Sequence, residues 1–522
     1  MKYSLPIALF TLLYLSSCQW FEDRPGGHEK ITQFVRVGDI QLAGGETAAE
    51  ISAYDPKTKR LFVANAVKTA IDVIDMSDPF NLSYESELSI AAYGGGVNSV
   101  SVKNGLLAAA VEADPKTAPG KVVIWNTTSL DVVSAVTVGS LPDMVTFSAD
   151  GKYIVSANEG EPNEDYSIDP NGSVSIIRVP GFRVTTVDFA AWAFSAASLK
   201  TKGFRTPGPA GTTFAADVEP EYVAISQKCD KAWVTLQENN AVARIDLSSA
   251  RIENIFPLGY KDHSLPGNEL DPSDRDGGAL LGSWPVKGMY LPDGIAAFNN
   301  LFTDYIITAN EGDSRIRPTS DDALPPLEEG DLFNEETRIG SVVLDPAKFP
   351  NAADLKANTR LGRLKITNTQ GDTDGDGDYD ALFSFGGRSF TIRNGQTGGI
   401  VYDAGSALER FLIDNDAALY ADDRSDDKGA EPESVAVGKI GTRTLAFVGL
   451  ERADAIVVVD VTVPNAPLYL QVIHTGDAPE GVLFIPANES PNKKSLLVTS
   501  CEGDGTIQVF QLSGEEAELA GW

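Results

Sequence analysis

The sequence predicts an all-β protein, a β-propeller of seven or eight three- to four-stranded antiparallel blades with long loop insertions. Short runs of β-branched and aromatic residues, bounded by Gly, Pro, Asn and Asp, recur at a spacing of tens of residues. Carboxylates return at the same point of each repeat, and no stretch beyond the N-terminal segment shows helical periodicity over three turns. A pair of β-sandwich domains is the alternative, but sandwiches do not require repeats in a fixed phase.

Eight repeating units can be recognised, of which the sixth is degenerate. They lie near residues 50–93, 97–140, 142–200, 219–258, 292–348, 381–415, 431–475 and 479–512. The strand at Phe34–Ile40 stands before the first unit, and we expect it to become the outer strand of the last blade, which removes an exposed sheet edge. The propeller should then span 34–512, with insertions near 259–291 and 316–380 and an acidic tail at 513–522.

The in-phase carboxylates form two sets. Five units open on a Pro-acid step, and the second strand of each of these units ends on another acid. The opening acids are Asp143, Glu221, Asp293, Glu433 and Glu480, and the closing acids are Glu159, Glu238, Glu311, Glu451 and Glu502. Glu50 opens one further unit and Glu112 closes another. Two antiparallel strands return the chain to its starting side, so a radial arrangement gathers all these acids on one face. We expect an acidic mouth that binds metal ions or a ligand.

The N-terminus reads as a targeting segment. The apolar run Ile7–Leu15 is short, and Leu15-Ser-Ser-Cys18 resembles a bacterial lipobox. We expect residues 1–17 to be a lipoprotein signal peptide, Cys18 to carry the lipid, and 18–33 to form a tether; an ordinary signal peptide or a membrane anchor is the alternative. The protein should therefore lie outside the cytoplasm, attached to a membrane through Cys18, at the outer membrane or cell surface if the source has two membranes.

Composition limits the partners. The formal net charge of −32 argues against binding nucleic acid and favours cations. Apart from Cys18, the cysteines are Cys229 and Cys501, whose positions in the repeat place them on opposite faces, so we expect both to be unpaired. The sequence does not give the oligomeric state.

The most specific local motif is an aspartate-rich loop. Its residues are Asp372, Asp374, Asp376, Asp378 and Asp380. Carboxylates at positions 1, 3 and 5 with Gly377 at position 6 form the first half of a calcium loop. Phe383 replaces the Glu expected at position 12, and no helices flank the loop, so it is not an EF-hand. A solvated acidic turn is the alternative; we expect the loop to bind Ca²⁺, because the carboxylates repel one another without a counter-ion.

Cationic residues interrupt the acidic pattern. Arg388 takes the opening position of the sixth unit, and Arg424 and Lys428 lie in another acidic run. An Arg in an anionic, metal-binding mouth suits an oxyanion such as phosphate, although pairing with neighbouring acids explains these residues equally well. Arg388, Arg424 and Glu311 are the candidate catalytic residues if the protein is an enzyme. We expect the 259–291 insertion to cover the mouth as a lid and its His263 to make a surface hydrogen bond.

These motifs, in this order, resemble the choice-of-anchor I family, which includes the mesenchyme-specific cell-surface glycoprotein of biomineralising cells. The resemblance rests on Pro142–Phe147, Ala157–Pro162, Glu219–Tyr222, Leu236–Ala241, Lys261–His263, Pro285–Tyr290, Ala309–Asp313, Gly387–Phe390, Asp422–Glu433 and Gly449–Arg452. It implies an exported YVTN-type β-propeller with one of several kinds of anchor. Some members carry an alkaline-phosphatase label, but without agreed catalytic residues.

Two functions therefore compete. The first is a lipid-anchored, extracytoplasmic, calcium-binding propeller whose acidic mouth binds an extracellular ligand, polymer, phosphate-containing molecule or mineral surface. The alternative is a calcium-dependent phosphohydrolase, similar to alkaline phosphatase or phytase, at the same mouth. No dedicated nucleophile, Gly-x-Ser-x-Gly elbow or Walker loop is present in the sequence, so the enzyme stands second.

Overall fold

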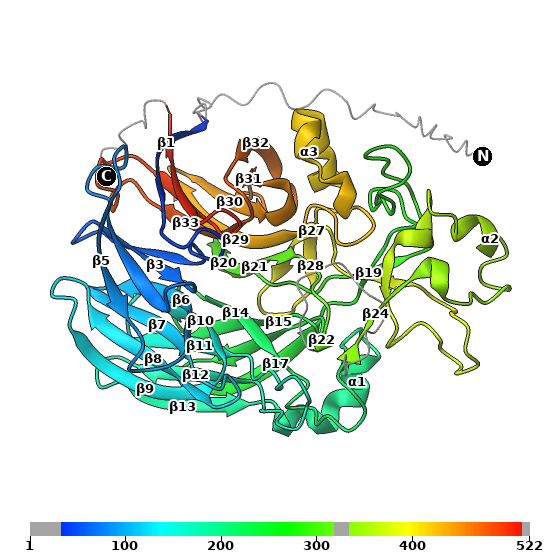
Figure 1. Cartoon of the computed structure of the whole chain (residues 1–522), viewed down its shortest axis with the longest axis horizontal. Helices are drawn as coiled ribbons and strands as arrows, with labels where there is room; N and C mark the ends of the chain where they lie inside the picture. The colour runs from blue at the N-terminus through cyan, green and yellow to red at the C-terminus, as the bar shows by residue number, and fades with distance from the viewer. Residues whose placement is uncertain (1–32, 318–332, 514–522) are drawn as a thin grey trace, which may run out of the picture.

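The computed structural model describes residues 33–317 and 333–513, and within them seven four-stranded antiparallel sheets surround a common centre (Figure 1). From the inside out, blade 1 consists of β2 (Ser52–Asp55), β3 (Arg60–Asn65), β4 (Ala70–Asp75) and β5 (Ser83–Ser89), and blade 2 of β6 (Gly96–Lys103), β7 (Leu106–Glu112), β8 (Pro119–Asn126) and β9 (Val132–Ser140). Blade 3 consists of β10 (Pro142–Phe147), β11 (Tyr153–Asn158), β12 (Ser173–Arg178) and β13 (Arg183–Asp188). Blade 4 consists of β14 (Pro220–Ile225), β15 (Lys231–Leu236), β16 (Ala241–Asp246) and β17 (Arg251–Pro257).

Blades 5 to 7 follow the same order. Blade 5 consists of β20 (Ile295–Asn300), β21 (Thr303–Asn310), β27 (Ser389–Asn394) and β28 (Ile400–Asp403). Blade 6 consists of β29 (Pro432–Ile440), β30 (Arg443–Leu450), β31 (Ala455–Asp460) and β32 (Leu468–His474). Blade 7 consists of β33 (Pro479–Ile485), β34 (Leu496–Cys501), β35 (Thr506–Leu512) and β1 (Phe34–Gln41). Each inner strand contacts the inner strand of the next blade, and β33 contacts β2, so the described blades form a closed ring. The predicted β-propeller is confirmed, with seven blades.

The N-terminal strand closes the ring as predicted. β1 pairs antiparallel with β35 from Phe34 opposite Leu512 to Gln41 opposite Thr506, and Figure 1 shows the blue first strand beside the red C-terminal strands. The first described strand thereby completes the last blade, and the two ends of the described chain hold the ring together.

The hydrophobic core is divided among the seven interfaces between neighbouring blades. One cluster of buried side chains joins each adjacent pair, including blades 7 and 1. Second and third strands are therefore buried on both faces, as in β31, where every residue is buried. The outer strand β13 has only exposed and half-buried residues, of which Val184 packs against the cluster of blades 2 and 3 and Val187 against the cluster of blades 3 and 4. This pattern explains the continuous apolar runs of the second strands in the sequence.

The fifth and sixth predicted units are one blade. The long segment after β21 leaves the ring, and the chain returns at β27 to supply the third strand of blade 5. The sequence prediction was wrong here because the insertion has its own strands, which imitate a degenerate repeat. Arg388 precedes this third strand, so it does not occupy an opening position, and that assignment is corrected.

The insertions build a separate five-stranded sheet beside the ring, at the right of Figure 1. Its strands, in order, are β18 (Tyr260–Asp262), β19 (Lys287–Met289), β26 (Phe383–Ser384), β25 (Lys365–Thr367) and β24 (Glu336–Arg338), and a short pair is formed by β22 (Ile316–Arg317) and β23 (Phe333–Asn334). The helices are η1 (Ala190–Ser195), α1 (Ala196–Lys200), η2 (Ile339–Ser341), α2 (Ala352–Leu355), η3 (Leu361–Arg363), α3 (Ala407–Asp416), η4 (Ala417–Leu419), η5 (Asp422–Arg424) and η6 (Glu451–Ala453). Buried apolar residues of both insertions share one core.

Both cysteines of the propeller are free, as predicted, and both are buried. Cys229 lies in the turn between β14 and β15, whereas Cys501 ends β34 at the opposite end of its blade. The predicted signal peptide, Cys18 and the acidic tail beyond Ser513 lie outside the described residues.

Candidate functional site

Seven residues stand where the inner strands begin, one in each blade, and six of them are acidic. We call this set the inner ring: Glu50, Asn98, Asp143, Glu221, Asp293, Glu433 and Glu480. Asn98 holds the position in blade 2, because the register shift between Val97 and Ser99 matches the shift that follows Pro142 in blade 3. Its amide donates to the Pro142 carbonyl at 3.1 Å, which links the two blades. Asn98 follows Val rather than Pro, so the Pro-acid pattern did not predict this seventh position.

The backbone is strained at this edge in the same way in four blades. Leu141, Leu291, Glu431 and Ala478 each precede the Pro of a Pro-acid step, and their φ angles lie between 41° and 51°. A non-glycine residue in this left-handed region costs on the order of 1–2 kcal/mol. In three of these blades a register shift follows the proline directly. The bulge takes the acidic residue out of the ladder, so a recurrent local distortion holds the inner ring at the mouth.

A second set of acids lies at or just after the ends of the second strands. We call it the outer ring: Glu112, Glu159, Glu238, Glu311, Glu451 and Glu502. Blade 1 has Ala66 at this position. Glu238, Glu311 and Glu451 are buried, and the other three are half-buried. The two rings therefore lie at one end of the blades, as the repeat phase predicted.

The carboxylates act on one another across the centre of the propeller. Burial raises the pKa of Glu480 in blade 7 well above its ordinary value, and Glu50, Glu502, Asp293 and Asp143 raise it further. Asp143 and Asp293 belong to blades 3 and 5, so residues far apart in the ring share one electrostatic environment. The predicted convergence of the acids is thus present in the folded chain.

The inner ring lacks compensating charge. Burial and other carboxylates all raise the pKa of Glu50, Glu221, Asp293, Glu433 and Glu480, and in the described part of the chain no cationic side chain is a main contributor. The pKa of Glu50 reaches about 9. Oε2 of Glu433 is buried without a hydrogen-bond partner among the described residues. Such a ring must hold protons or cations near neutral pH.

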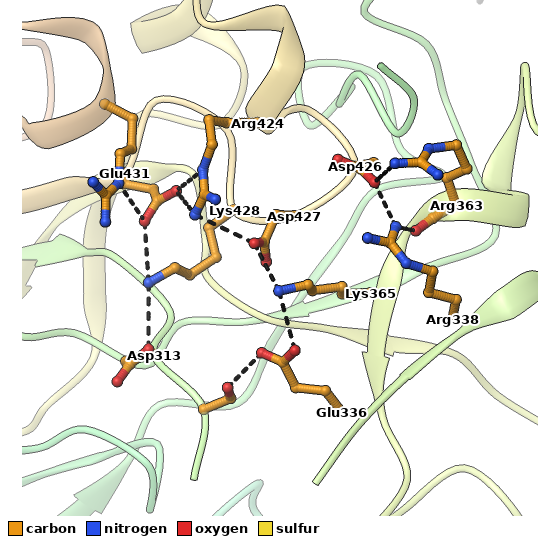
Figure 2. A network of polar contacts seen from close by, with 12 residues as sticks. Asp313, Glu336, Arg338, Arg363, Lys365, Arg424, Asp426, Asp427, Lys428 and Glu431 are labelled. Atoms are coloured by element: carbon orange, nitrogen blue, oxygen red, sulfur yellow. Dashed lines mark hydrogen bonds and ion pairs between the residues drawn. The ribbon is translucent and has the colours of Figure 1, made fainter. Parts of the chain in front are cut away.

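The outer ring, in contrast, is partly neutralised by cations on the side of blades 5 and 6. Lys428 Nζ lies 2.5 Å from Glu311 Oε1, 3.1 Å from Glu431 Oε2 and 3.4 Å from Asp313 Oδ1. Arg424 Nη2 lies 2.7 Å from Glu431 Oε1. Figure 2 shows Lys428 and Arg424 reaching Glu431 from the same loop. The predicted catalytic residues Glu311 and Arg424 therefore lie close together, and each is engaged in an ion pair.

A second group of cations forms ion pairs with acids of blades 3 and 4. Arg315 is fully buried, with Nη2 at 2.7 Å from Glu219 Oε2 and 3.9 Å from Glu238 Oε2, and Arg317 pairs with Glu161. The pKa of Glu219 is nevertheless raised, to about 8, because burial outweighs the attraction of Arg315. These cations come from the segment that follows β21, so the insertion supplies countercharges to the mouth.

A profile of the choice-of-anchor I domain matches residues 50–464, which include the first five blades and the three inner strands of the sixth. The chain belongs to the choice-of-anchor I family. The mesenchyme-specific cell surface glycoprotein of Strongylocentrotus purpuratus is 28% identical over 343 residues, or 59% of this chain and 42% of that protein. Gigasin-3a of Magallana gigas is 30% identical over 197 residues, or 32% of this chain and 69% of that protein. This choice-of-anchor I protein thus aligns with less than half of the sea urchin protein's length.

Solved structures resemble the fold at low sequence identity. Kuenenia stuttgartiensis hydrazine synthase is 11% identical, with a TM-score of 0.47 over 91% of this chain and 98% of that one. The RRP9 WD40 repeats are 9% identical, with a TM-score of 0.48 over 92% of this chain and 100% of that one. The β-propeller assignment of this family member rests on its own sheet order and ring closure.

Arg388 has a structural role in this choice-of-anchor I protein. Its buried guanidinium donates to the backbone carbonyls of Asp271 at 2.6 Å, Ser425 at 2.6 Å and Asp427 at 3.0 Å. These bonds join the first insertion to the loop after α3. The donors are oriented toward carbonyl oxygens of the protein, which leaves the phosphate-binding hypothesis for Arg388 without geometric support.

The expectation of a surface role for His263 was wrong. His263 is buried, Nδ1 lies 2.6 Å from the Asn268 carbonyl, and burial lowers its pKa to about 3. The neighbouring Lys261 is also buried and donates to the Gly387 carbonyl at 2.7 Å. The start of this insertion therefore packs against blade 5, although its polar sequence indicated an exposed segment.

The aspartate-rich loop lies between β25 and β26, in the insertion sheet. Asp372 accepts hydrogen bonds from the backbone amides of Gly375 at 2.7 Å and Gly377 at 3.0 Å, and both glycines have positive φ. Carboxylate oxygens lie within 4.8 Å of one another in two groups: Asp372, Asp374 and Asp380, and Asp345, Asp378 and Asp380. The loop thus brings four of its five aspartates together and adds Asp345, which comes from a distant segment without a motif. Asp376 instead accepts from the Asp378 amide at 3.1 Å.

A cavity lies among the inner strands of the propeller. It is lined by inner-strand residues of blades 1, 2, 3 and 7 together with Tyr222 of blade 4, and its empty volume is about 820 Å³, part of it open to solvent. Burial and four inner-ring acids raise the pKa of Tyr222, so this neutral hydroxyl lies near the ring. The cavity lining includes the residues that follow Glu50, Asp143 and Glu480 in the chain, so the cavity lies next to the inner ring.

Sequence reasoning also missed two acids of the mouth. Glu219 and Glu431 are almost completely buried and pair with Arg315 and with Arg424 and Lys428. Both precede the Pro of a Pro-acid step, in the repeated triplet Glu-Pro-Glu. That repetition was the available signal, and it distinguishes blades 4 and 6 from the others.

Proposed function

We propose that this choice-of-anchor I protein is a lipid-anchored, extracytoplasmic, calcium-binding β-propeller whose acidic mouth holds cations that bind an anionic ligand, polymer or mineral surface. The observation that carries the proposal is the inner ring, in which six carboxylates from six blades converge and no cationic side chain of the described residues is a main contributor to their pKa values. A divalent cation supplies the missing charge and displaces the protons that the ring otherwise keeps.

The donor set favours calcium. Ca²⁺ takes six to eight oxygen ligands at about 2.3–2.6 Å and tolerates irregular geometry. The rings supply carboxylates and one amide, and the groups of converging metal-ligating residues in the described chain contain carboxylates alone. A cation bound by only a few ring carboxylates keeps positions for outside ligands. Such ions at the mouth would connect the protein to phosphate, carboxylate or carbonate groups of a partner.

The proposed anchor fits an outward-facing mouth. Phe34 begins β1 opposite Leu512, at the end of blade 7 away from Glu480, so a tether from Cys18 would join the face opposite the mouth. On that face the turn between β20 and β21 exposes Leu301 and Phe302, which are 85% and 93% accessible. In the described part of the chain, no helix has the length and apolarity needed to cross a bilayer. Attachment through Cys18 would leave the acidic mouth directed away from the membrane.

The phosphohydrolase hypothesis has weaker support. It needs a cationic side chain free to hold a phosphoryl oxygen, whereas Arg388 binds carbonyl groups and Arg424 binds Glu431. The described mouth also contains several acids that repel a phosphate unless metal ions mask them. Binding through calcium is therefore the function that the geometry supports best.

Calcium titration of the non-lipidated protein tests the proposal. Replacing Glu480 and Asp143, which belong to blades 7 and 3 and act on each other electrostatically, with Gln and Asn should lower calcium affinity at least tenfold or remove a binding equivalent. Glu87→Gln, on the outer strand β5, is the matched control and should leave binding unchanged. Equal binding by the ring variant and the control would overturn the proposal. Release of phosphate from a phosphomonoester that requires calcium would instead establish the enzyme.

A further inference from the structure

Three aspartates outside both rings converge beside the insertion. Asp271 and Asp276 lie in the segment between β18 and β19, whose base is closed by the bridge between Leu270 and Gly282. Asp422 begins η5, in the loop after α3. One oxygen of each carboxylate lies within 4.8 Å of the others. No repeat or recognised calcium motif predicts this group, because its members come from segments far apart in the sequence.

Buried polar atoms without hydrogen-bond partners in the described chain gather at this point. Oδ1 of Asp276 and Oδ1 of Asp422 are both buried and have no hydrogen-bond partner among the described residues. Tyr420 is only 6% exposed, and its hydroxyl also has no partner in that part of the chain. Burial is the main cause that raises the pKa of Tyr420, and Asp271 and Asp422 lie near enough to this phenol to add to the shift. Buried oxygens without partners cost free energy comparable to a lost hydrogen bond each, and a bound cation would remove that cost.

Backbone amides hold the carboxylate of Asp271 in place. Asp271 is fully buried, and its two oxygens accept from the amides of Ser273 at 3.3 Å and Leu280 at 2.8 Å. A carboxylate oxygen can accept from an amide and still bind a metal ion, because it has two lone pairs. The amides therefore orient Asp271 toward Asp276 and Asp422 without occupying it.

The spacing suits a hard divalent cation. Two oxygens on opposite sides of Ca²⁺ are about 4.8 Å apart, twice the usual calcium–oxygen distance, and neighbouring ligands lie closer. The three carboxylates fit within that limit. Gly277 and Gly278 follow Asp276 with φ of 103° and 133°, a backbone that a residue with a side chain rarely adopts, so the chain can turn sharply behind this ligand. All three donors are carboxylate oxygens, which disfavours the softer transition metals.

We propose that Asp271, Asp276 and Asp422 bind a calcium ion that fastens the first insertion to the loop after α3. That loop continues through Arg424 and Lys428, the cations that neutralise Glu311 and Glu431 in the mouth. The ion thus secures the segment that sets the charge of one side of the mouth. This site stands independently of the proposed function of the inner ring.

The number of bound calcium ions gives the direct test. Equilibrium dialysis of the non-lipidated full chain should show one ion fewer for Asp276→Asn/Asp422→Asn than for the wild type. Asp423→Asn, which alters the exposed neighbour of Asp422, is the matched control and should keep the wild-type number. A double variant with an unchanged number of ions would overturn the proposal. Combining it with Glu480→Gln separates the two sites, because losses at independent sites add.

Hydrogen exchange of the wild-type protein keeps the proposal testable if the double variant does not fold. Calcium should slow amide exchange in residues 271–282 and 420–424 together. If local opening releases the ion, calcium at 100 times its dissociation constant should slow exchange about 100-fold. Unchanged exchange in either segment would show that no ion joins them.

Discussion

Replacing Glu50 with Gln should stabilise the calcium-free protein at alkaline pH. Burial, Glu502, Asp143 and Glu112 raise the pKa of Glu50 to about 9 from an ordinary value of 4.5. The folded state therefore binds more protons than the unfolded chain between these two values, and the free energy of unfolding falls as pH rises through that window. Glutamine has nearly the same shape and does not ionise, so the variant lacks this contribution.

The structure sets the magnitude of this effect. Each pKa unit corresponds to about 1.4 kcal/mol, so keeping one proton on Glu50 at pH 8 costs roughly 5 kcal/mol. This is an upper limit, because Glu50 is half-buried and water screens part of the interaction. The stabilisation should approach zero at pH 4, where the folded and unfolded states are both protonated. In saturating calcium the order should reverse, because the wild type keeps a carboxylate ligand that the variant lacks.

Thermal unfolding in chelator and in calcium, from pH 4 to pH 9, measures these differences. Glu431→Gln is the matched control, since this fully buried carboxylate pairs with Arg424 at 2.7 Å and Lys428 at 3.1 Å. Breaking such a pair typically costs about 3–5 kcal/mol, so this control should unfold at lower temperature at pH 8. If Glu50→Gln is destabilised like the control in chelator, protein contacts already satisfy the inner ring and the reasoning fails.

Three further predictions concern the rest of the chain. The Asp374→Asn/Asp376→Asn variant should bind calcium more weakly at the insertion loop, because it loses Asp374 as a ligand, and the pH dependence of its stability should be unchanged. Isothermal titration calorimetry that shows no change in calcium binding would contradict the loop's calcium role. Arg388→Ala should destabilise the fold by about 3 kcal/mol or more, because three buried carbonyl groups lose a charged donor; an unchanged denaturation midpoint would contradict this structural role. Cys229 and Cys501 should react with a thiol reagent only after unfolding, since both are buried and free; rapid labelling of the native protein would argue against the described packing.

Much of the fold follows from local sequence chemistry. Alternating and continuous apolar runs specify strands, and their repetition specifies blades that bury both faces against neighbours. The Phe34–Ile40 strand could be assigned to the last blade because a propeller without it would leave an open edge. The blade count was ambiguous because the 381–415 unit mixes a strand of the insertion sheet with two strands of blade 5. Strand propensity describes a segment and not its pairing partner.

The acids of the site were predictable for the same reason, since antiparallel strands return every repeat to one edge. The cations near the acids could also be recognised, but the acid with which each one pairs could not. Lys428 and Arg315 reach Glu311 and Glu219 over separations that no motif records, and Arg388 resembles a phosphate-binding residue until its carbonyl partners are known. Long-range pairing depends on which loops fold back across the mouth.

By itself, the sequence determined that this protein is a propeller with a carboxylate-rich face and two free cysteines. The strands and the carboxylates recur from repeat to repeat, and the positions of the two cysteines within their repeats place them on opposite faces. The tertiary structure alone decided which carboxylates keep a countercharge and which do not. Charge compensation depends on distances of a few ångströms between segments that are remote in sequence. The uncompensated inner ring and the trio of Asp271, Asp276 and Asp422 both result from such distances.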